Sequence, residues 1–413
     1  MLRKLNKKKR LLLWSGMFLL LVVFGGCYAM TKDRKGNSET EAGMKAEESI
    51  KTEKSIKTED NIKTDMTENS ASTASVNTKE ERKEATELTQ DMAKTALDSF
   101  LSSFYVKEEK GGYIVGEDFW QQAEIFEVVI DAYERTGEER YLALMEDMYR
   151  GFLAKHGEDW SYNDFNDDIM WMTIACARAY EATKDAKYLA IAEKHFNIVF
   201  DRAWSEDLGG GLFWKTENKT KNSCINSPAA IAACLLGNAT GKQEYYDKAV
   251  KIYQWEKENL FGATGAVFDA YDLKTGINQW CSTYNQGTLI GAATLLYQIY
   301  GEETYLQDAK LAADYTVNTM FSGQVMNTEG EGNDLPGFKG ILARWLGKFV
   351  RESGQEQYAD WMEQNALAAW NNRNSNGIMW TQFNTKTGDT FYTAWGCSAA
   401  VSMLMNTPHK RNE

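Results

Sequence analysis

The chain has 413 residues, of which 12% are aromatic, and a formal net charge of −13 at pH 7. Its basic residues are concentrated only in the first ten positions, which argues against a nucleic-acid partner. The three histidines, His156, His195 and His409, are far apart in the sequence and predict no zinc site. We expect a partner that is neutral or is recognised through hydrogen bonds, and neither a metal nor an organic cofactor.

The N-terminus has the pattern of a bacterial export signal. A basic head is followed by an apolar run from Leu11 to Phe24, two glycines and Cys27. Because this run is shorter than the roughly 20 residues of a spanning helix, we expect residues 1–27 to be a lipoprotein signal with Cys27 acylated. Phe24 fits that pattern weakly, so an uncleaved anchor stays open. The expected location is the extracellular face of the bacterial cell membrane, with secretion as the alternative.

The next part of the chain differs sharply from the remainder in composition. Residues 28–85 are rich in Glu, Lys, Thr, Ser and Asn and contain SIKTEKSIKTEDNIKTD. They hold too little apolar surface to offset the entropy of ordering, so we expect a polar stalk that is disordered. Residues 86–408, rich in Trp and Tyr, have the length of one large barrel domain, which we expect to be monomeric.

A phrase of a small or turn residue, a few charges and then Tyr recurs five times, with the tyrosines at 141, 188, 245, 305 and 358. This spacing suits a repeated unit of two helices and a loop. Apolar periodicity predicts twelve helices, over residues 86–105, 117–136, 139–155, 165–183, 186–201, 226–240, 243–259, 284–300, 303–320, 336–353, 356–372 and 391–406. Six hairpins of this kind describe an all-α (α/α)6 barrel, with short Gly turns on one rim and long functional loops on the other. Short strand patterns in GAVFDAYD and GIMWTQFN predict hairpins within the connections.

The long loops carry carboxylates, amides and aromatic residues. This mixture suits sugar binding, because amides and carboxylates bond hydroxyl groups while Trp and Tyr stack on pyranose faces. Three tryptophans at helical spacing are either core residues or ligand platforms: Trp120, Trp171 and Trp345. Five others in connections are expected to be more exposed: Trp160, Trp204, Trp214, Trp280 and Trp380. Cys224 and Cys281 lie in predicted loops and could form a disulfide, although no disulfide framework is visible.

Asp167 and Asp168 are adjacent in YNDFNDDIMW, at the start of a predicted helix. One explanation is structural, since the helix dipole favours acids in the first turn by roughly a few tenths of a kcal/mol. The other explanation is chemical. Where water is excluded, one carboxylate stays ionised as a nucleophile and raises the pKa of its neighbour, which then serves as proton donor. Glycosidic cleavage requires this division of roles.

The motifs resemble glycoside hydrolase family 76, the bacterial α-1,6-mannanases, over roughly residues 91–405. The resemblance rests on FWQQAEIFEVVIDAYERTG, NDDIMW followed by ARAYEAT, GGGLFWK with KNSCINSPAA, TYNQGTLIGA and FKGILARW. It implies an (α/α)6 fold and a retaining, endo-acting mannan endo-1,6-α-mannosidase. The implied substrates are α-mannan polysaccharide and mannooligosaccharides.

The resemblance also implies residue roles. By motif, Asp167 is the nucleophile and Asp168 the acid and base, while Asp269 binds sugar. Six further residues are inferred sugar ligands from motif position: Gln122, Asn226, Tyr284, Asn285, Gln286 and Lys339. No metal ligand is implied.

Two departures from the family pattern matter. The insertion Asn163-Asp164-Phe165 nearly duplicates the acidic motif, so Asp164 competes with Asp167 for the role of nucleophile. The phrase NDDIMW, which continues the family motif, favours Asp167. Met172 stands where the family commonly carries an aromatic residue, which leaves the width of the pocket beside the pair open.

Two other functions stay open. An α-mannan transglycosylase of the same fold would share the covalent intermediate and pass the mannan chain to a sugar instead of water. A non-catalytic surface glycan-binding lipoprotein would hold polysaccharide at the cell, although it would not need both acids. A lyase or epimerase is expected to show a catalytic His or a Tyr-Arg set, and no His lies in the long-loop motifs.

Overall fold

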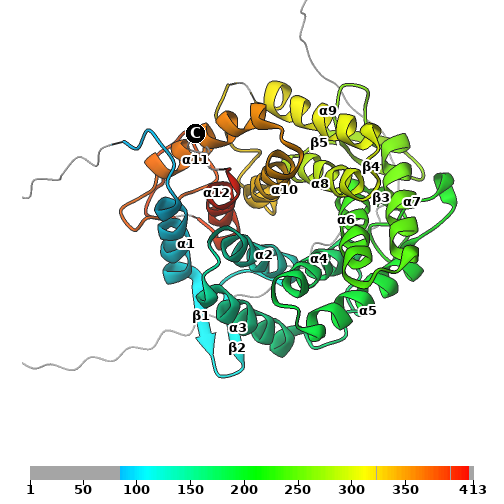
Figure 1. Cartoon of the computed structure of the whole chain (residues 1–413), viewed down its shortest axis with the longest axis horizontal. Coiled ribbons are helices and arrows are strands. Elements are labelled where there is room, and N and C mark those ends of the chain that lie inside the picture. Colours follow the sequence, from blue (N-terminus) through cyan, green and yellow to red (C-terminus); the bar gives the residue numbers. More distant parts are fainter. Residues whose placement is uncertain (1–83, 322, 391, 409–413) are drawn as a thin grey trace, which may run out of the picture. The chain divides into compact units, whose positions relative to one another are not determined.

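The computed structural model describes residues 84–321, 323–390 and 392–408 (Figure 1). The predicted lipoprotein signal, with Cys27, and residues 28–83 of the predicted stalk lie outside this part of the chain. Six inner helices surround a common axis: α2 (Phe119–Thr136), α4 (Asn166–Thr183), α6 (Ser223–Thr240), α8 (Thr283–Tyr300), α10 (Phe338–Ser353) and α12 (Ala394–Asn406). Six outer helices cover them: α1 (Gln90–Phe104), α3 (Glu139–His156), α5 (Ala186–Ala203), α7 (Gln243–Asn259), α9 (Glu303–Thr319) and α11 (Ala359–Asn371).

The inner helices form a closed ring. Each contacts the next along the chain, and α12 returns to contact α2 (Figure 1). Each outer helix packs against the inner helix with which it forms a hairpin, and α1 at the start of the domain pairs with α12 at its end. The predicted (α/α)6 barrel is confirmed, with helix bounds within a few residues of those expected. None of the helices in the described ranges is long and apolar enough to cross a membrane.

Small residues allow the inner helices to approach one another closely. A Cβ atom at Gly287 of α8 would lie 2.6 Å from the Cα atom of Leu342 on α10, and one at Gly291 would lie 2.6 Å from the Trp345 ring. Trp345 is 1% exposed and belongs to the core. Glycine at position 287 therefore lets the backbones of α8 and α10 approach closely, and glycine at 291 makes room for the Trp345 ring.

The turns that join inner to outer helices are short, as predicted. Gly137, Gly241, Gly301 and Gly354 end their helices in the left-handed region, with φ between 65° and 69°. Lys184 takes the same place after α4 with φ 57°. These residues close one rim of the barrel, so the long connections all lie at the N-terminal ends of the inner helices.

Strands are confined to the connections. A hairpin of β1 (Tyr105–Glu108) and β2 (Gly111–Ile114), which the sequence pattern missed, follows α1. β3 (Thr220–Asn222), β4 (Phe268–Asp272) and β5 (Gly276–Cys281) form an antiparallel sheet in that order, so the strand predicted in GAVFDAYD is confirmed.

The strand predicted in GIMWTQFN is wrong, because residues 377–384 contain turns and bends instead. The side chain of Asn374 accepts hydrogen bonds from the main-chain N–H groups of Asn376 and Ile378, at 3.0 and 2.9 Å. Thr387 Oγ1 accepts another from the Trp380 N–H at 2.9 Å. Side chains thus take the bonds that a strand ladder would use.

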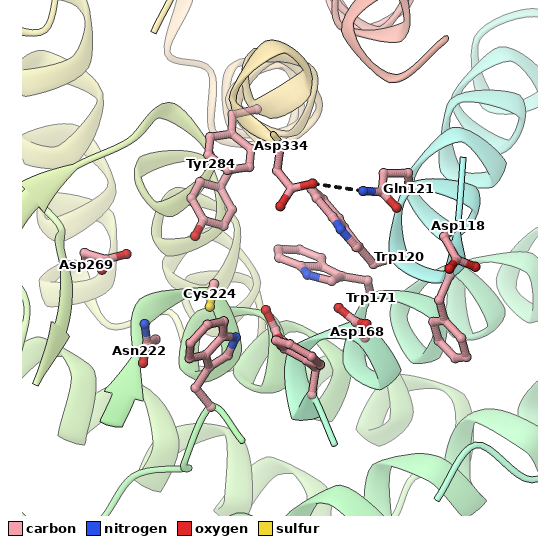
Figure 2. Close-up of a pocket in the computed structure, with 15 residues that line it drawn as sticks. Asp118, Trp120, Gln121, Asp168, Trp171, Asn222, Cys224, Asp269, Tyr284 and Asp334 are labelled. Carbon is pink, nitrogen blue, oxygen red and sulfur yellow. Dashed lines mark hydrogen bonds between the residues drawn. The ribbon is translucent and has the colours of Figure 1, made fainter. Parts of the chain in front are cut away.

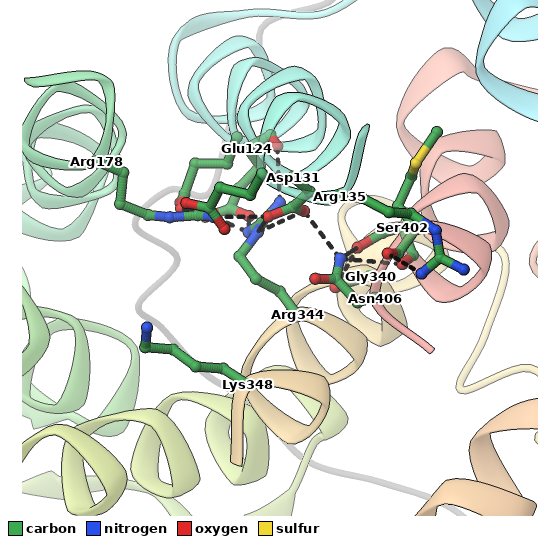
Figure 3. Close-up of polar contacts among 12 residues, drawn as sticks. Glu124, Asp131, Arg135, Arg178, Gly340, Arg344, Lys348, Ser402 and Asn406 are labelled. Carbon is green, nitrogen blue, oxygen red and sulfur yellow. Dashed lines mark hydrogen bonds and ion pairs between the residues drawn. The ribbon is translucent and has the colours of Figure 1, made fainter. Parts of the chain in front are cut away.

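A buried ionic network joins four inner helices (Figure 3). Arg344 of α10 lies 2.5 Å from Glu124 and 3.0 Å from Asp131 of α2, measured from guanidinium nitrogen to carboxylate oxygen. Arg178 of α4 lies 2.8 Å from Asp131, and Asn406 of α12 donates to Asp131 at 2.9 Å. Burial raises the pKa of Glu124 to about 8. Burial opposes ionisation of Asp131 too, but the two arginines hold its pKa below the usual value.

Candidate active site

A cavity of about 510 Å³ opens at the rim that carries the long loops (Figure 2). Most of its walls come from the N-terminal ends of α2, α4, α6, α8 and α10 and the residues just before them, while Trp214 and Asp269 come from the longer connections. The lining residues are Asp118, Phe119, Trp120, Gln121, Phe165, Asp167, Asp168, Trp171, Trp214, Asn222, Cys224, Asp269, Tyr284, Asp334 and Phe338. Five carboxylates face the cavity, and the positive ends of these helix dipoles help to accommodate their charge.

The first turn of α4 places Asp167 and Asp168 in this cavity. Asp167 is only 9% exposed, and its Oδ1 atom has no hydrogen-bond partner among the described residues. Asp168 Oδ2 accepts a 2.9 Å hydrogen bond from the Asn163 amide. Asp164 does not line the cavity; it is exposed and accepts a 2.8 Å hydrogen bond from the Thr216 hydroxyl. The geometry therefore distinguishes the two copies of the acidic motif, because only the copy with Asp167 and Asp168 faces the cavity.

The pKa values of the pair are raised, but the main cause differs from the expected one. Burial raises the pKa of Asp167 well above its usual value, and the charge of Asp168 raises it further. The nearby Trp214 indole and Cys224 thiol offset part of this rise. Burial also raises the pKa of Asp168 to about 6; the bond from Asn163 opposes this, and the charges of Asp334 and Asp118 add to it. Burial, not mutual repulsion, is the main cause of both rises.

Aromatic side chains form much of the cavity wall. Trp120 and Trp171 both line it, with ring centroids 6.3 Å apart, and Tyr284 stacks on Phe338 at 3.9 Å. Trp214 also lines it, and Lys215 Nζ lies 4.3 Å from the centre of the Trp214 ring. Flat apolar faces of this kind suit pyranose rings.

The other tryptophans predicted in connections differ in how exposed their side chains are. Trp280 is 44% exposed, as expected, while Trp204 and Trp380 are half-buried. The expected exposure of Trp160 is wrong, because its ring is fully buried and stacks on His195 at 3.8 Å. The suggested disulfide is not formed either; Cys224 and Cys281 are both free.

Only two of the seven predicted sugar ligands line the cavity. Asp269 on β4 accepts a 2.9 Å hydrogen bond from Asn278, and burial raises its pKa. Tyr284 forms part of the aromatic wall at the start of α8. Asn285, the next residue, is fully buried and does not line the cavity.

The structure corrects the other four assignments of sugar ligands. These side chains already form hydrogen bonds with main-chain groups of the protein. The Gln122 amide bonds both the N–H and the C=O of Ile114, at 3.1 and 2.6 Å. The Asn226 amide does the same with Leu212, at 2.8 and 3.1 Å. Gln286 accepts from the Val267 N–H and donates to two carbonyls. Lys339 Nζ donates to the carbonyls of Asn327 and Thr381.

Four polar residues of the cavity were not predicted individually: Asp118, Gln121, Asn222 and Asp334. Gln121 precedes Gln122, and a step of one residue turns a side chain by about 100° around a helix. Asp334 comes from a long loop whose residues show no periodicity. The one feature of the sequence that could have identified them is their position, since all four lie just before or within the first turn of an inner helix.

The sequence pattern of glycosyl hydrolase family 76 matches residues 88–411. The chain belongs to this family. Among solved family 76 structures, an inactive variant of the α-1,6-mannanase of Salegentibacter sp. HEL1_6, in complex with α-1,6-mannotriose, superposes with a TM-score of 0.72. It is 30% identical in sequence, and the match covers 77% of this chain and 98% of that one. In that variant two consecutive aspartates are replaced by asparagine.

Two other relatives extend the comparison. The Lin0763 protein of Listeria innocua has a TM-score of 0.70 and 26% identity, over 78% of this chain and 99% of that one. The mannan endo-1,6-alpha-mannosidase DCW1 of Saccharomyces cerevisiae is 27% identical over 60% of this chain and 61% of its own length. The chain thus spans about three fifths of the length of this curated relative. The family 76 assignment agrees with the (α/α)6 fold seen in the helices.

Proposed function

We propose that this protein is an endo-acting mannanase that hydrolyses α-1,6-mannosidic bonds in mannan backbones and retains the anomeric configuration. The observation that carries the proposal is the adjacent pair Asp167 and Asp168, buried in a cavity with aromatic walls. Its support is the relative from Salegentibacter, in which replacing two consecutive aspartates leaves an inactive protein that still holds α-1,6-mannotriose.

The proposed chemistry is a double displacement. Asp168 transfers its proton to the glycosidic oxygen while the Asp167 carboxylate attacks the anomeric carbon, and the bond to the leaving sugar breaks. Asp168, now ionised, takes a proton from water, which attacks the same carbon and releases Asp167 as a carboxylate. Two inversions restore the α configuration. The Oδ1 atom of Asp167 has no hydrogen-bond partner among the described residues, which suits the role of nucleophile.

The pair must hold one proton to react, which predicts the pH dependence. Burial raises the pKa of Asp168 to about 6 and that of Asp167 well above its usual value. Below about pH 6 both acids are protonated and no nucleophile exists. We therefore expect kcat/KM to rise as the pH increases through about 6 and to fall again only where the second proton leaves. Initial rates on linear α-1,6-mannan from about pH 4 to about pH 9 measure this; a rate that declines steadily from the acid end would contradict it.

The test of the function is digestion of linear α-1,6-mannan by the purified protein. We expect mannooligosaccharides of mixed length at early times, as internal cleavage requires, and α products in NMR spectra recorded before mutarotation. Release of mannose alone would contradict endo action, and binding of mannan without cleavage would favour a glycan-capture protein. An added acceptor sugar distinguishes hydrolysis from transglycosylation, because only a transglycosylase makes longer products at the expense of hydrolysis.

We also propose that Cys27 is acylated and anchors the enzyme at the extracellular face of the bacterial cell membrane. The support is the basic head, short apolar run and small residues that precede Cys27 in the sequence. We expect Cys27→Ala to abolish labelling with radioactive palmitate in a bacterial host and to move the protein out of the membrane fraction. Equal labelling of both proteins would show that Cys27 is not the lipidated residue.

A further inference from the structure

Gln121 and Asp334 come from different walls of the cavity and are joined by a hydrogen bond. The Gln121 Nε2 atom on α2 donates to Asp334 Oδ1, on the loop before α10, at 2.9 Å (Figure 2). Because the amide nitrogen is used in this way, the orientation of the Gln121 side chain is set. Its Oε1 atom is buried and has no hydrogen-bond partner among the described residues.

The loop that carries Asp334 is held firmly against α12. The Asp334 main-chain oxygen accepts a 2.7 Å hydrogen bond from the Trp395 indole. A Cβ atom at Gly337, three residues later, would lie 1.9 Å from the Trp395 ring, so the loop backbone rests directly on that ring. The carboxylate of Asp334 is therefore presented to the cavity in a defined position.

The unused polar atom at this place is an acceptor, Gln121 Oε1, which is buried and lacks a partner among the described residues. The Asp334 carboxylate also lines the cavity, where burial raises its pKa and the nearby Gln121 amide and Trp120 indole oppose that rise. A buried acceptor without a donor is unfavourable, so a ligand that supplies a donor is favoured. Trp120 lines the cavity beside them and offers an aromatic face. Two hydroxyl donors next to an apolar ring face describe one pyranose residue.

A second set of cavity acceptors lies elsewhere. Asn222 Oδ1 is also buried without a partner, and Asp269 lies near it. Figure 2 shows Asn222 and Asp269 on one side of the cavity and Gln121 and Trp120 on the other, with Asp168 nearer to Trp120. An enzyme that cuts within a chain needs sugar contacts on both sides of the bond that it breaks.

We propose that Gln121 and Asp334, with the ring of Trp120, form a separate mannosyl-binding subsite, on the opposite side of the cavity from Asn222 and Asp269. This inference rests on the proposed function, because it takes the ligand to be an α-1,6-mannooligosaccharide. The pair binds two hydroxyl groups of one sugar residue. It thereby determines which glycosidic bond of the mannan lies at the catalytic aspartates.

The test is calorimetric binding of α-1,6-mannotriose to the full chain carrying Asp168→Asn, which prevents turnover. In this background, Gln121→Met removes the amide at similar side-chain length, and Asp334→Asn replaces an acceptor oxygen with a donor. We expect each change to raise the Kd by about tenfold or more. The double variant is expected to add little to the larger single effect, because the two side chains act as a pair. Asp164→Asn and Gln254→Met, on the exposed surface, are the matched controls and should leave the Kd unchanged.

The outcomes separate this inference from the proposed function. Unchanged Kd values in both variants, with circular dichroism spectra like those of the parent, would overturn the subsite even if the native enzyme cleaves mannan. Fully additive effects would show two independent contacts and would overturn the pair. If the native protein neither cleaves mannan nor binds mannotriose, the proposed function fails, and the subsite falls with it.

Discussion

Asparagine in place of Asp167 or Asp168 is expected to reduce kcat for linear α-1,6-mannan by about 10⁴-fold, in line with the loss of one member of a catalytic set. Asp167→Asn removes the attacking carboxylate, and Asp168→Asn removes the proton donor. Release of reducing sugar, followed to long times with concentrated enzyme, measures the residual rate. Asp164→Asn makes the same chemical change at the exposed near-copy of the motif, and we expect it to keep full activity.

Chemical rescue distinguishes the two roles. With an activated α-mannoside whose leaving group needs no proton, Asp168→Ala should still form the covalent intermediate, and added azide should give the α-mannosyl azide. Asp167→Ala should form no intermediate, so azide attacks directly and gives the β-mannosyl azide. The opposite pair of products would exchange the roles of the two residues. Loss of activity in Asp164→Asn comparable to that of Asp167→Asn would overturn the choice of the pair.

The same variants test whether the two aspartates stabilise the folded protein or act in catalysis. Because burial raises the folded-state pKa of Asp167, the folded protein binds this proton more tightly than the unfolded chain does. Ionisation therefore lowers stability as the pH rises above the unfolded-state pKa. Asp167→Asn is expected to raise the melting temperature at neutral pH, whereas a purely helix-stabilising acid would lower it when lost.

Arg344→Ala is expected to lower the free energy of unfolding by about 3–5 kcal/mol, the range found when one partner of a buried ion pair is removed. The Arg344 side chain is 3% exposed and contacts three carboxylates of α2: Glu124, Glu127 and Asp131. Its loss leaves these acids buried with less compensation and opens a cavity between α2 and α10. Urea unfolding followed by tryptophan fluorescence measures the change.

Lys348→Ala is the matched control for this substitution. Lys348 lies one turn further along α10 than Arg344 (Figure 3). Its Nζ atom is 2.6 Å from a Glu352 carboxylate oxygen in an i,i+4 pair near the surface. We expect its removal to cost less than about 1 kcal/mol. Similar losses for both substitutions would show that the buried network contributes no more than a surface pair, contrary to our expectation.

The architecture could be predicted from the sequence because the signals that specify it are local. Helix periodicity, the recurring tyrosine and the glycine turns each operate within a few tens of residues, and together they gave the (α/α)6 barrel with accurate helix positions. The adjacent aspartates were found for the same reason: their place in a first helical turn can be read from the neighbouring residues.

The selection of sugar ligands by motif was much less accurate. Gln122, Asn226, Gln286 and Lys339 stand at the expected rim, but they hold the main chain of the long loops. Polar residues near a site serve either the ligand or the loops around it, and sequence position does not distinguish the two uses.

The sequence by itself thus determined the helical repeat, the rim that carries the long loops and the acidic pair, because each depends on neighbours along the chain. Only the tertiary structure decided which side chains face the cavity, since a step of one residue turns Gln121 toward it and Gln122 away. It also decided that the pKa values of Asp167 and Asp168 are raised, because burial is supplied by elements far away in the sequence. The ionic network around Asp131 is non-local in the same way, with partners on three other helices.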